Sequence, residues 1–281
     1  MSRVLPITKY PFDDLGLCVY YHTKLIHLDD IITQNHLIAS LPSKVNDLDE
    51  MAVEIKGKLS ERYIYGRQRD LEFPFQPRND MSKNFNLNRV SLGHCLAKKK
   101  FKQDYIDPLY GFICFSDSMS LDESRYIQSR MWRKYADNYK GVRLKFKIDQ
   151  NFVANTQKDE FLIGFIDYEA PPVIDVGIIE SEDKIRDQIR ENYSSIMYHK
   201  SQRWKREKEV RISGFCRNMD KCGVGSGSRC FVKFNPESLL RVDLGWQCHL
   251  DESVITKLRD RGVDLFKVDS YTKGSISYVK I

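Results

Sequence analysis

Short apolar and aromatic runs, separated by polar stretches, are the clearest pattern in this chain, and they predict β-strands. Residues 17–21 (LCVYY) and 111–116 (GFICFS) are apolar enough to be buried strands. Residues 142–148 instead alternate between apolar and basic side chains, which predicts a strand with one solvated face. The same reasoning predicts further strands at residues 161–168, 208–213 and 230–234.

Apolar residues at helical spacing occur between these runs. Trp132, Tyr135 and Tyr139 fall on one face of a predicted helix that Gly141 can terminate. Thr23 can cap another helix. The helices are interspersed with the strands without regular βαβ alternation, so we expect an α+β fold. Two of the predicted helices begin after Thr23 and after Ser181. The other two span residues 122–140 and 252–261.

The sequence shows no sign of a boundary between domains. No linker rich in proline or glycine interrupts the sequence, and no internal repeat is visible. We therefore expect a single domain over residues 1–281. Residues 56–105 are polar, rich in asparagine and weakly periodic, so they are predicted to form an insertion on the core of that domain.

The composition is typical of a globular cytoplasmic protein. Hydrophobic residues make up 41% and aromatic residues 12% of the 281 positions, which is too apolar for a disordered chain. No apolar stretch approaches the ~20 residues that span a bilayer, and residues 1–14 lack the apolar core of a secretory signal. The seven cysteines are odd in number and scattered, which favours reduced thiols. We therefore expect a cytoplasmic protein without membrane contact.

Basic residues exceed acidic ones, 45 to 39, which gives a net charge of +6 and permits a polyanionic partner. They concentrate at residues 98–102 and 203–208. In the second cluster a tryptophan can stack on a nucleic-acid base while its basic neighbours hold phosphates. The alternative is that these charges only keep the protein soluble. The predicted nucleic-acid contacts are Arg203, Trp204, Lys205 and Arg206.

Several common chemistries lack their motifs. There is no GxxxxGK[ST] phosphate-binding loop and no GxSxG elbow, so neither a P-loop nucleotide hydrolase nor a serine hydrolase is expected. No CxxC pair is present, and Cys216, Cys222 and Cys230 are spaced too widely for a zinc knuckle. We therefore expect no metal.

His22 lies in the first of two places that can carry chemistry. With Tyr21 and Thr23 it stands where a predicted strand passes into a helix, and the rim of a sheet is a common position for a ligand. The alternative is a buried histidine whose ring nitrogens bond to local backbone groups.

Glu207 and Glu209 form the second place. If residues 208–213 are a strand, both carboxylates share one face with Arg211, while Val210 and Ile212 point into the core. Such a pair can orient an acceptor and stabilise positive charge. The alternative is an exposed strand with an ion pair between Glu209 and Arg211.

Two segments carry a resemblance to a known family. They are MWxxYADxxxGV over residues 131–142 and KxxxWxxExExRI over residues 200–212. With residues 21–37, the turn at residues 43–50, the run at 111–116 and residues 234–245, they resemble a bacterial family of domains of unknown function that is often encoded beside phage-defence and toxin genes. The resemblance covers most of the chain outside residues 56–105.

The early and late parts of the chain also resemble ADP-ribosyltransferases, above all bacterial toxins that modify nucleic acids. In these enzymes a histidine or arginine at the place of His22 binds the ribose of NAD, and the catalytic glutamate is often the second of an E-x-E pair, as Glu209 is here. The resemblance implies two packed, mostly antiparallel sheets that flank an NAD cleft, with helices around them. The S-T-S motif of arginine-modifying enzymes is absent and Ser116 is only a partial counterpart, which argues against arginine as the acceptor.

The implied site combines a catalytic carboxylate with an NAD pocket. Breaking the bond between nicotinamide and ribose creates an oxocarbenium-like centre, which a nearby carboxylate stabilises more than it stabilises the ground state. Glu209 is the expected catalytic residue and Glu207 its accessory. Trp132 and Tyr135 are expected as an aromatic pocket wall, with core packing as their alternative role. The expected NAD contacts are Tyr21, His22, Thr23, Ser116, Trp132 and Tyr135.

The function expected from these resemblances is that of an NAD-dependent ADP-ribosyltransferase toxin. Its acceptor is expected to be a base in single-stranded nucleic acid, RNA before DNA. Its setting is expected to be phage defence or a toxin–antitoxin system, with an antitoxin or chaperone as a protein partner. The alternatives are ADP-ribosylation of a protein, a nucleic-acid-binding module without catalysis, and an NAD glycohydrolase.

Overall fold

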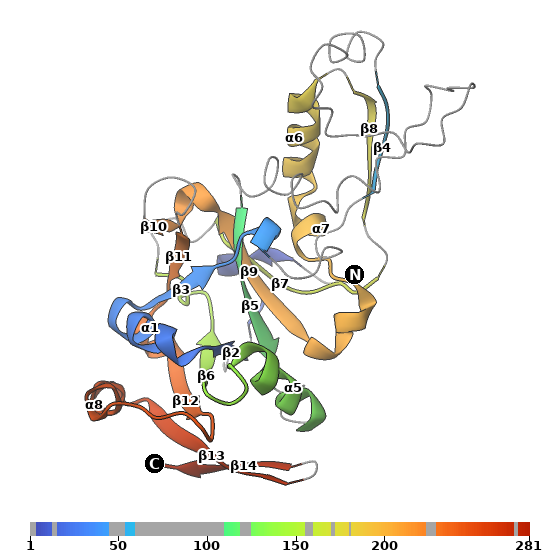
Figure 1. The fold of residues 1–281 in the computed structure, drawn as a ribbon. Helices are drawn as coiled ribbons and strands as arrows, with labels where there is room; N and C mark the ends of the chain where they lie inside the picture. The colour runs from blue at the N-terminus through green and yellow to red at the C-terminus, as the bar shows by residue number, and fades with distance from the viewer. Residues whose placement is uncertain are drawn as a thin grey trace. The chain divides into compact units, whose positions relative to one another are not determined.

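The chain forms two compact units in the computed structural model (Figure 1). Ser40–Gly111 and Asp167–Arg203 form the smaller unit, and Ser2–Ala39, Phe112–Ile166 and Trp204–Ile281 form the larger unit. The predicted single domain stays a prediction, and of its insertion only residues 56–59 lie within the described chain. The described residues are 4–12, 16–44, 54–59, 110–118, 125–154, 160–169, 172–179, 181–222, 229–272 and 275–281.

The larger unit is built on a nine-stranded sheet in the order β1-β7-β9-β5-β2-β6-β12-β13-β14. The registers described between its neighbours are antiparallel, except that β12 runs parallel to β13. A three-stranded sheet of β10, β11 and β3 accompanies it. The strands are β1 (Leu5–Pro6), β2 (Leu17–Thr23), β3 (His36–Ala39), β5 (Tyr110–Asp117), β6 (Val142–Ile148), β7 (Leu162–Phe165), β9 (Glu209–Phe215), β10 (Asp220–Cys222), β11 (Arg229–Lys233), β12 (Leu239–Leu244), β13 (Asp264–Thr272) and β14 (Ser275–Lys280).

Helices complete both units. In the larger unit α5 (Arg125–Tyr135) packs against β2 and β14, α8 (Glu252–Asp260) packs against β13, and α1 (Leu28–Gln34) packs against β3. The smaller unit pairs β4 with β8 in parallel and adds two helices. Its elements are β4 (Glu54–Leu59), β8 (Val173–Ile179), α6 (Glu182–Glu191) and α7 (Tyr193–Met197). The Ser181 hydroxyl accepts a bond from the Lys184 backbone N–H, which confirms it as the cap of α6.

The architecture confirms the coarse part of the predicted fold. It is a mixed arrangement of helices and strands with a large, mostly antiparallel sheet and a small second sheet. Among the described residues no helix is long and apolar enough to cross a membrane. The predicted strand at residues 142–148 matches β6, and the predicted helix at 252–261 matches α8 to within one residue.

Phenylalanines form the hydrophobic core on one side of the nine-stranded sheet. Phe115 of β5 lies 6.1 Å from Phe146 of β6 between ring centroids, and Phe146 lies 5.1 Å from Phe234. Phe152 contacts all three rings, and each of the four is at most 2% exposed. The alternation of apolar residues along β2, β5 and β6 places this core on a single face of the sheet.

Two local predictions are wrong, and a third is only partly right. Thr23 does not cap a helix, because it is the last residue of β2 and a 3₁₀ helix at Leu25–His27 precedes α1. The helix predicted over 122–140 ends at Tyr135. The basic face of β6 is only partly solvated, since Arg143 is 1% exposed whereas Lys145 and Lys147 are half-buried.

An unusual turn ends α5. Asp137, Asn138 and Tyr139 all have left-handed φ values, of 48°, 53° and 68°. The turn directs the Tyr139 ring back onto Trp132, with a centroid distance of 5.6 Å and nearly parallel planes. Gly245 packs against the backbone of this turn, and a Cβ atom there would lie 2.0 Å from the carbonyl oxygen of Tyr139.

Gly245→Ala should therefore destabilise the larger unit by about 3 kcal/mol, because backbone rather than a flexible side chain has to move. Gly262→Ala is the matched control. Its φ of 71° strains any L-residue, which costs about 1 kcal/mol, but nothing lies within 4 Å of the added carbon. Urea unfolding of both variants measures the difference, and equal losses would contradict the close contact.

Candidate functional site

Polar side chains line one face of the central strands of the nine-stranded sheet, opposite the phenylalanine core. Tyr20 of β2 is paired with Ser116 of β5, and His22 of β2 is paired with Arg143 of β6. Arg143 is in turn paired with Asp243 of β12. Because directly paired residues project to the same side of a sheet, these side chains share one face, which we call the polar face.

Strand β9 extends the polar face. The Arg211 guanidinium lies 4.6 Å from the centroid of the Phe112 ring, and Phe112 projects from β5 on the same side as Ser116. Arg211 Nε donates to Glu209 Oε1 at 2.5 Å, and both side chains are buried. Consecutive strands β9, β5 and β2 thus place Glu209, Ser116 and His22 on one face.

Helix α5 covers the polar face. Met131 and Tyr20 are buried against each other, and Ile127 packs against the pair. The Trp132 ring meets the His22 ring edge-on at a centroid distance of 5.9 Å. The polar side chains below α5 are therefore removed from bulk water and need partners within the protein.

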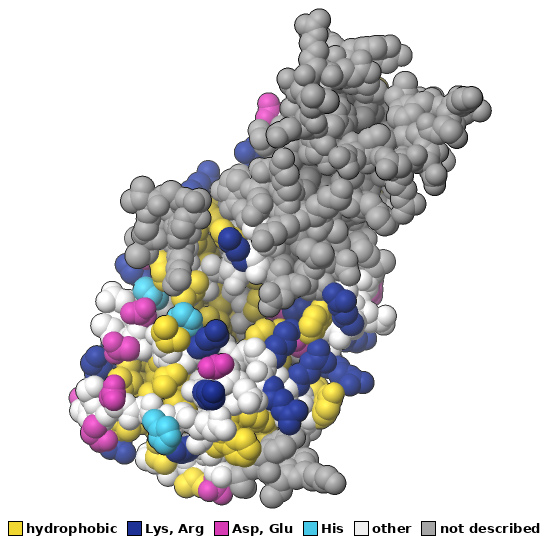
Figure 2. Space-filling view, in the orientation of Figure 1, with side chains coloured by type: hydrophobic (Ala, Val, Ile, Leu, Met, Phe, Trp, Pro, Cys, Tyr) yellow, Lys and Arg dark blue, Asp and Glu magenta, His cyan; other side chains and the backbone are white. Residues whose placement is uncertain are grey.

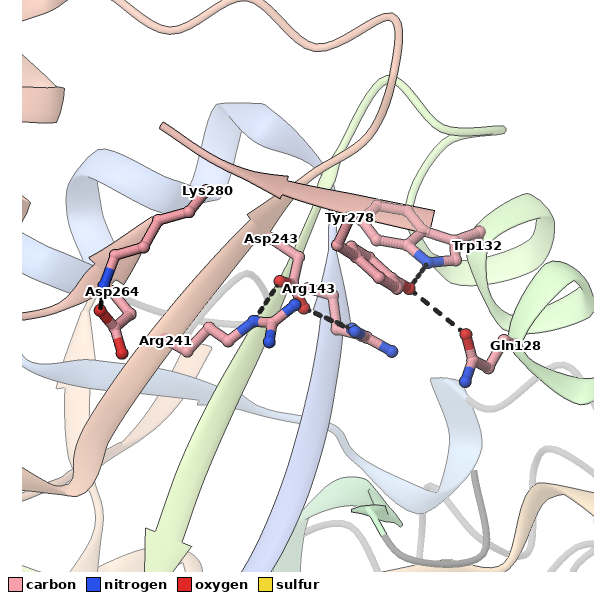
Figure 3. Close-up of polar contacts among 8 residues, drawn as sticks. All are labelled: Gln128, Trp132, Arg143, Arg241, Asp243, Asp264, Tyr278 and Lys280. Carbon is pink, nitrogen blue, oxygen red and sulfur yellow. Dashed lines mark hydrogen bonds and ion pairs between the residues drawn. The ribbon is translucent and has the colours of Figure 1, made fainter. Parts of the chain in front are cut away.

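Arg143 and Asp243 provide the strongest of these partnerships (Figure 3). They are 1% and 0% exposed, and Arg143 Nε and Nη2 each lie 2.7 Å from Asp243 Oδ2. Arg241 donates to the other carboxylate oxygen. Burial lowers the pKa of Arg143, but the Asp243 carboxylate more than offsets this and the net pKa is raised. The Arg143 guanidinium also lies 4.0 Å from the ring centroid of Tyr20 and 4.6 Å from that of Tyr278.

His22 differs from its neighbours because both of its ring nitrogens are buried and neither forms a hydrogen bond with any described residue. The backbone bonding of the alternative interpretation is thus not observed. Burial, and secondarily the charge of Arg143, hold the pKa of His22 well below its ordinary value. The ring is therefore neutral and presents one donor and one acceptor to a ligand.

The low pKa of His22 predicts a loss of stability in acid. The unfolded chain takes up a proton near pH 6.5 whereas the folded chain does not, so the stability present above that pH is lost as the pH falls. The free energy of unfolding should fall by up to about 1.4 kcal/mol per pH unit below 6.5.

His22→Phe should flatten this dependence, and thermal melts between pH 5 and 7.5 measure it. The exposed His249 gives the control variant His249→Gln, which should keep the wild-type slope. His36, whose pKa burial also lowers, is present in all three proteins and cancels in the comparison. If the stability of His22→Phe depends on pH as steeply as that of the wild type, the low pKa is not a property of His22.

Tyr21 and Thr23 lie on the other side of β2 from His22, because alternate residues of a strand face opposite ways. The Tyr21 ring is 5.9 Å from that of Phe115 in the apolar core, and burial raises the pKa of Tyr21 to about 12. Thr23 is buried as well. The structure does not bring these two predicted NAD contacts together with His22.

The predicted arrangement of the two carboxylates on one strand face is wrong. Strand β9 begins at Glu209, whereas Glu207 ends a 3₁₀ helix at Gln202–Glu207. Lys208 between them has a left-handed φ of 47°, which interrupts the alternation. The Glu209–Arg211 ion pair exists, but both strand faces are buried, so the exposed strand of the alternative interpretation is wrong too.

Trp132 and Tyr135 of α5 have different surroundings. Trp132 is fully buried, stacks on Tyr139 and donates from Nε1 to the Tyr278 hydroxyl at 3.2 Å, so it packs in the core. The Tyr135 hydroxyl instead reaches Glu207, 3.0 Å from Oε1 and 3.2 Å from Oε2. Tyr135 thus meets one of the two predicted carboxylates.

The predicted nucleic-acid contacts divide between the two units. Arg203 belongs to the smaller unit, and Trp204, Lys205 and Arg206 belong to the larger. The Lys134 ammonium group lies 3.6 Å from the Trp204 ring centroid and 3.3 Å from Glu207 Oε1. The basic residues 98–102 lie outside the described residues.

Arg143 and Asp243 are the residues that sequence reasoning missed. Arg143 alternates with apolar residues in VRLKFKI, and Asp243 stands with Arg241 among apolar residues in LLRVDL. Opposite charges in two strands can form a buried pair, but two strands about 100 residues apart had to be placed side by side to identify it. No cluster that could hold a metal occurs among the described histidine, cysteine, aspartate and glutamate residues.

Part of the chain matches a known protein family. Residues 131–212 match a family described as a protein of unknown function (DUF2971). The interval includes both the MWxxYADxxxGV and the KxxxWxxExExRI segment, and it agrees with the predicted resemblance to a family of domains of unknown function. No curated protein and no solved structure matches the chain.

Proposed function

We propose that the protein is an ADP-ribosyltransferase that uses NAD as a substrate. The observation that carries the proposal is the placement of Glu209, Ser116 and His22 on three consecutive strands, with their side chains on one polar face. These are the residues that the resemblance to ADP-ribosyltransferases implies for catalysis and NAD binding. They are 93 or more positions apart along the chain, so the fold has to bring them together.

Glu209 is the proposed catalytic carboxylate. As the bond between nicotinamide and ribose breaks, positive charge develops on the ribose, and the Glu209 carboxylate stabilises that charge. Arg211 holds Glu209 by a 2.5 Å bond, so the carboxylate is oriented before the reaction. The departing nicotinamide keeps the electron pair of the broken bond, and the acceptor supplies the pair that forms the new bond.

His22 is the proposed ribose contact. Its neutral ring has a buried donor and a buried acceptor that no described residue satisfies, which suits ribose hydroxyl groups. Because α5 covers this face, α5 has to shift for a nucleotide to reach His22. We therefore expect NAD to change the fluorescence of Trp132, which lies against His22.

A base in single-stranded nucleic acid, RNA before DNA, is the proposed acceptor. The net charge of +6 and the basic segment around Trp204 support a polyanionic acceptor. The resemblance implies that the protein acts as a toxin in phage defence. It also implies that an antitoxin or chaperone neutralises the toxin.

Incubation with NAD labelled in the adenylate moiety, together with separate pools of RNA, DNA and protein, tests the proposal. Label on RNA or DNA supports the proposal. Label on protein alone would mean that the protein transfers ADP-ribose, but to a protein acceptor rather than to a nucleic acid. Release of nicotinamide without labelled polymer would indicate a glycohydrolase. If the folded protein leaves NAD intact in the presence of all three pools, the proposal that it is an enzyme acting on NAD is refuted.

A further inference from the structure

Cationic and aromatic side chains gather on α5 and the segment beside it. Figure 2 shows lysine and arginine side chains clustered over α5 and residues 204–208. The patch contains six cationic residues. The only carboxylate within α5 and residues 204–208, both of which the structure describes, is Glu207, and it is buried. We call the patch the α5 basic surface; it consists of Tyr126, Arg130, Arg133, Lys134, Trp204, Lys205, Arg206 and Lys208, all in the larger unit.

Trp204 organises cations on this surface and is not an open ring. Lys134 Nζ lies 3.6 Å from its ring centroid, and the Arg130 guanidinium lies 5.2 Å from it. Glu207 fixes Lys134 in this position through a 3.3 Å ion pair. A base that stacked on Trp204 would have to displace these two cations, so the structure argues against the stacking role that the sequence suggests for Trp204.

Tyr126 is the exposed ring of the α5 basic surface. It is 66% exposed, which is high for so large an apolar side chain. The Arg206 guanidinium lies 6.0 Å from its ring centroid. Within the described part of the chain, Arg130, Lys205 and Arg206 form no ion pair with a carboxylate.

Unpaired cations beside an exposed aromatic ring fit one class of partner. The cations suit backbone phosphates, and the ring suits the face of a base. A base is accessible for stacking only where it is unpaired, so a duplex would engage the cations but not Tyr126. We infer that the α5 basic surface binds single-stranded nucleic acid, with Tyr126 stacked on a base and with Arg130, Lys205 and Arg206 on phosphates.

This inference deepens the proposed function, on which it rests for the identification of the bound strand as the acceptor. Binding is measured by fluorescence anisotropy on the full chain without NAD. The probes are a labelled 15-nucleotide RNA of mixed sequence, the DNA of the same sequence and the corresponding DNA duplex. Binding can therefore fail while NAD cleavage persists, and the reverse.

Tyr126→Ala should weaken single-strand binding roughly 5- to 150-fold, because base stacking on an aromatic ring is lost. Tyr126→Phe is the matched control and should bind like wild type, since the ring is retained. Tyr126→Ala should leave duplex binding unchanged. Wild-type single-strand affinity in Tyr126→Ala, or an equal loss in Tyr126→Phe, would overturn the stacking role.

The salt dependence of binding tests the phosphate contacts separately. For three contacts the logarithm of the binding constant should fall with that of the salt concentration with a slope of about −2, which is roughly a 20-fold loss between 50 and 200 mM. Lys205→Gln/Arg206→Gln should reduce the slope to about −0.7. Lys257→Gln/Arg259→Gln on α8 makes the same charge change and should leave the slope unchanged. Binding that is indifferent to salt, or equal slopes for the two double variants, would overturn the inference.

Discussion

Glu209→Gln should lower ADP-ribosyl transfer by about 10²–10³-fold, the loss measured when one preorganised stabilising group is removed from an active site. Glutamine keeps the shape of the side chain but removes the charge that faces the developing positive centre. The measurement is the initial rate of nicotinamide release and of polymer labelling per folded protein. Glu252→Gln, at an exposed position of α8, is the surface control and should retain the wild-type rate.

The buried ion pair complicates this variant, and a second variant resolves it. Glu209→Gln leaves the Arg211 guanidinium, which is 0% exposed, without its charge partner, and breaking a buried pair from one side costs about 3–5 kcal/mol. Glu209→Gln/Arg211→Met removes both charges and should recover most of that stability. It should nevertheless stay inactive. Activity that returns together with stability would show that Glu209 acts on folding alone.

Local patterns in the sequence were sufficient to predict five consecutive strands of the nine-stranded sheet, β7-β9-β5-β2-β6. Apolar runs predict β2 and β5 to within a few residues, because a buried strand is rich in apolar side chains. Alternation predicts the full length of β6. The buried strands are therefore the part of the fold that local sequence determines most directly.

Backbone conformation at single residues is what the sequence does not reveal. Lys208 adopts a left-handed φ that separates Glu207 from β9, although nothing marks this lysine among its charged neighbours. The three left-handed residues after α5 likewise end a helix whose apolar spacing continues to Tyr139. After α5, tertiary packing overrides local preference, since Tyr139 gains a stacking partner in Trp132.

The candidate site was predictable residue by residue but not as an arrangement. His22 and Glu209 stand out as polar groups beside apolar strands, yet their common face depends on the strand order β9-β5-β2. Arg143 illustrates the limit of the pattern. Its alternation with apolar residues predicts a solvated face, whereas the partner that buries it, Asp243, comes from a strand 100 residues later.

Asp243→Asn should strongly destabilise the larger unit. Asparagine keeps the size of the side chain but removes the carboxylate that pairs with Arg143, which is 1% exposed. The expected loss is about 3–5 kcal/mol of unfolding free energy, or roughly 6–20 °C in Tm. Calorimetry measures it. Asp264→Asn is the matched control, because Asp264 forms an exposed ion pair with Lys280 and its removal should leave the Tm unchanged. An Asp243→Asn protein that melts with the Asp264→Asn control would show that the Arg143 charge is compensated elsewhere in the fold.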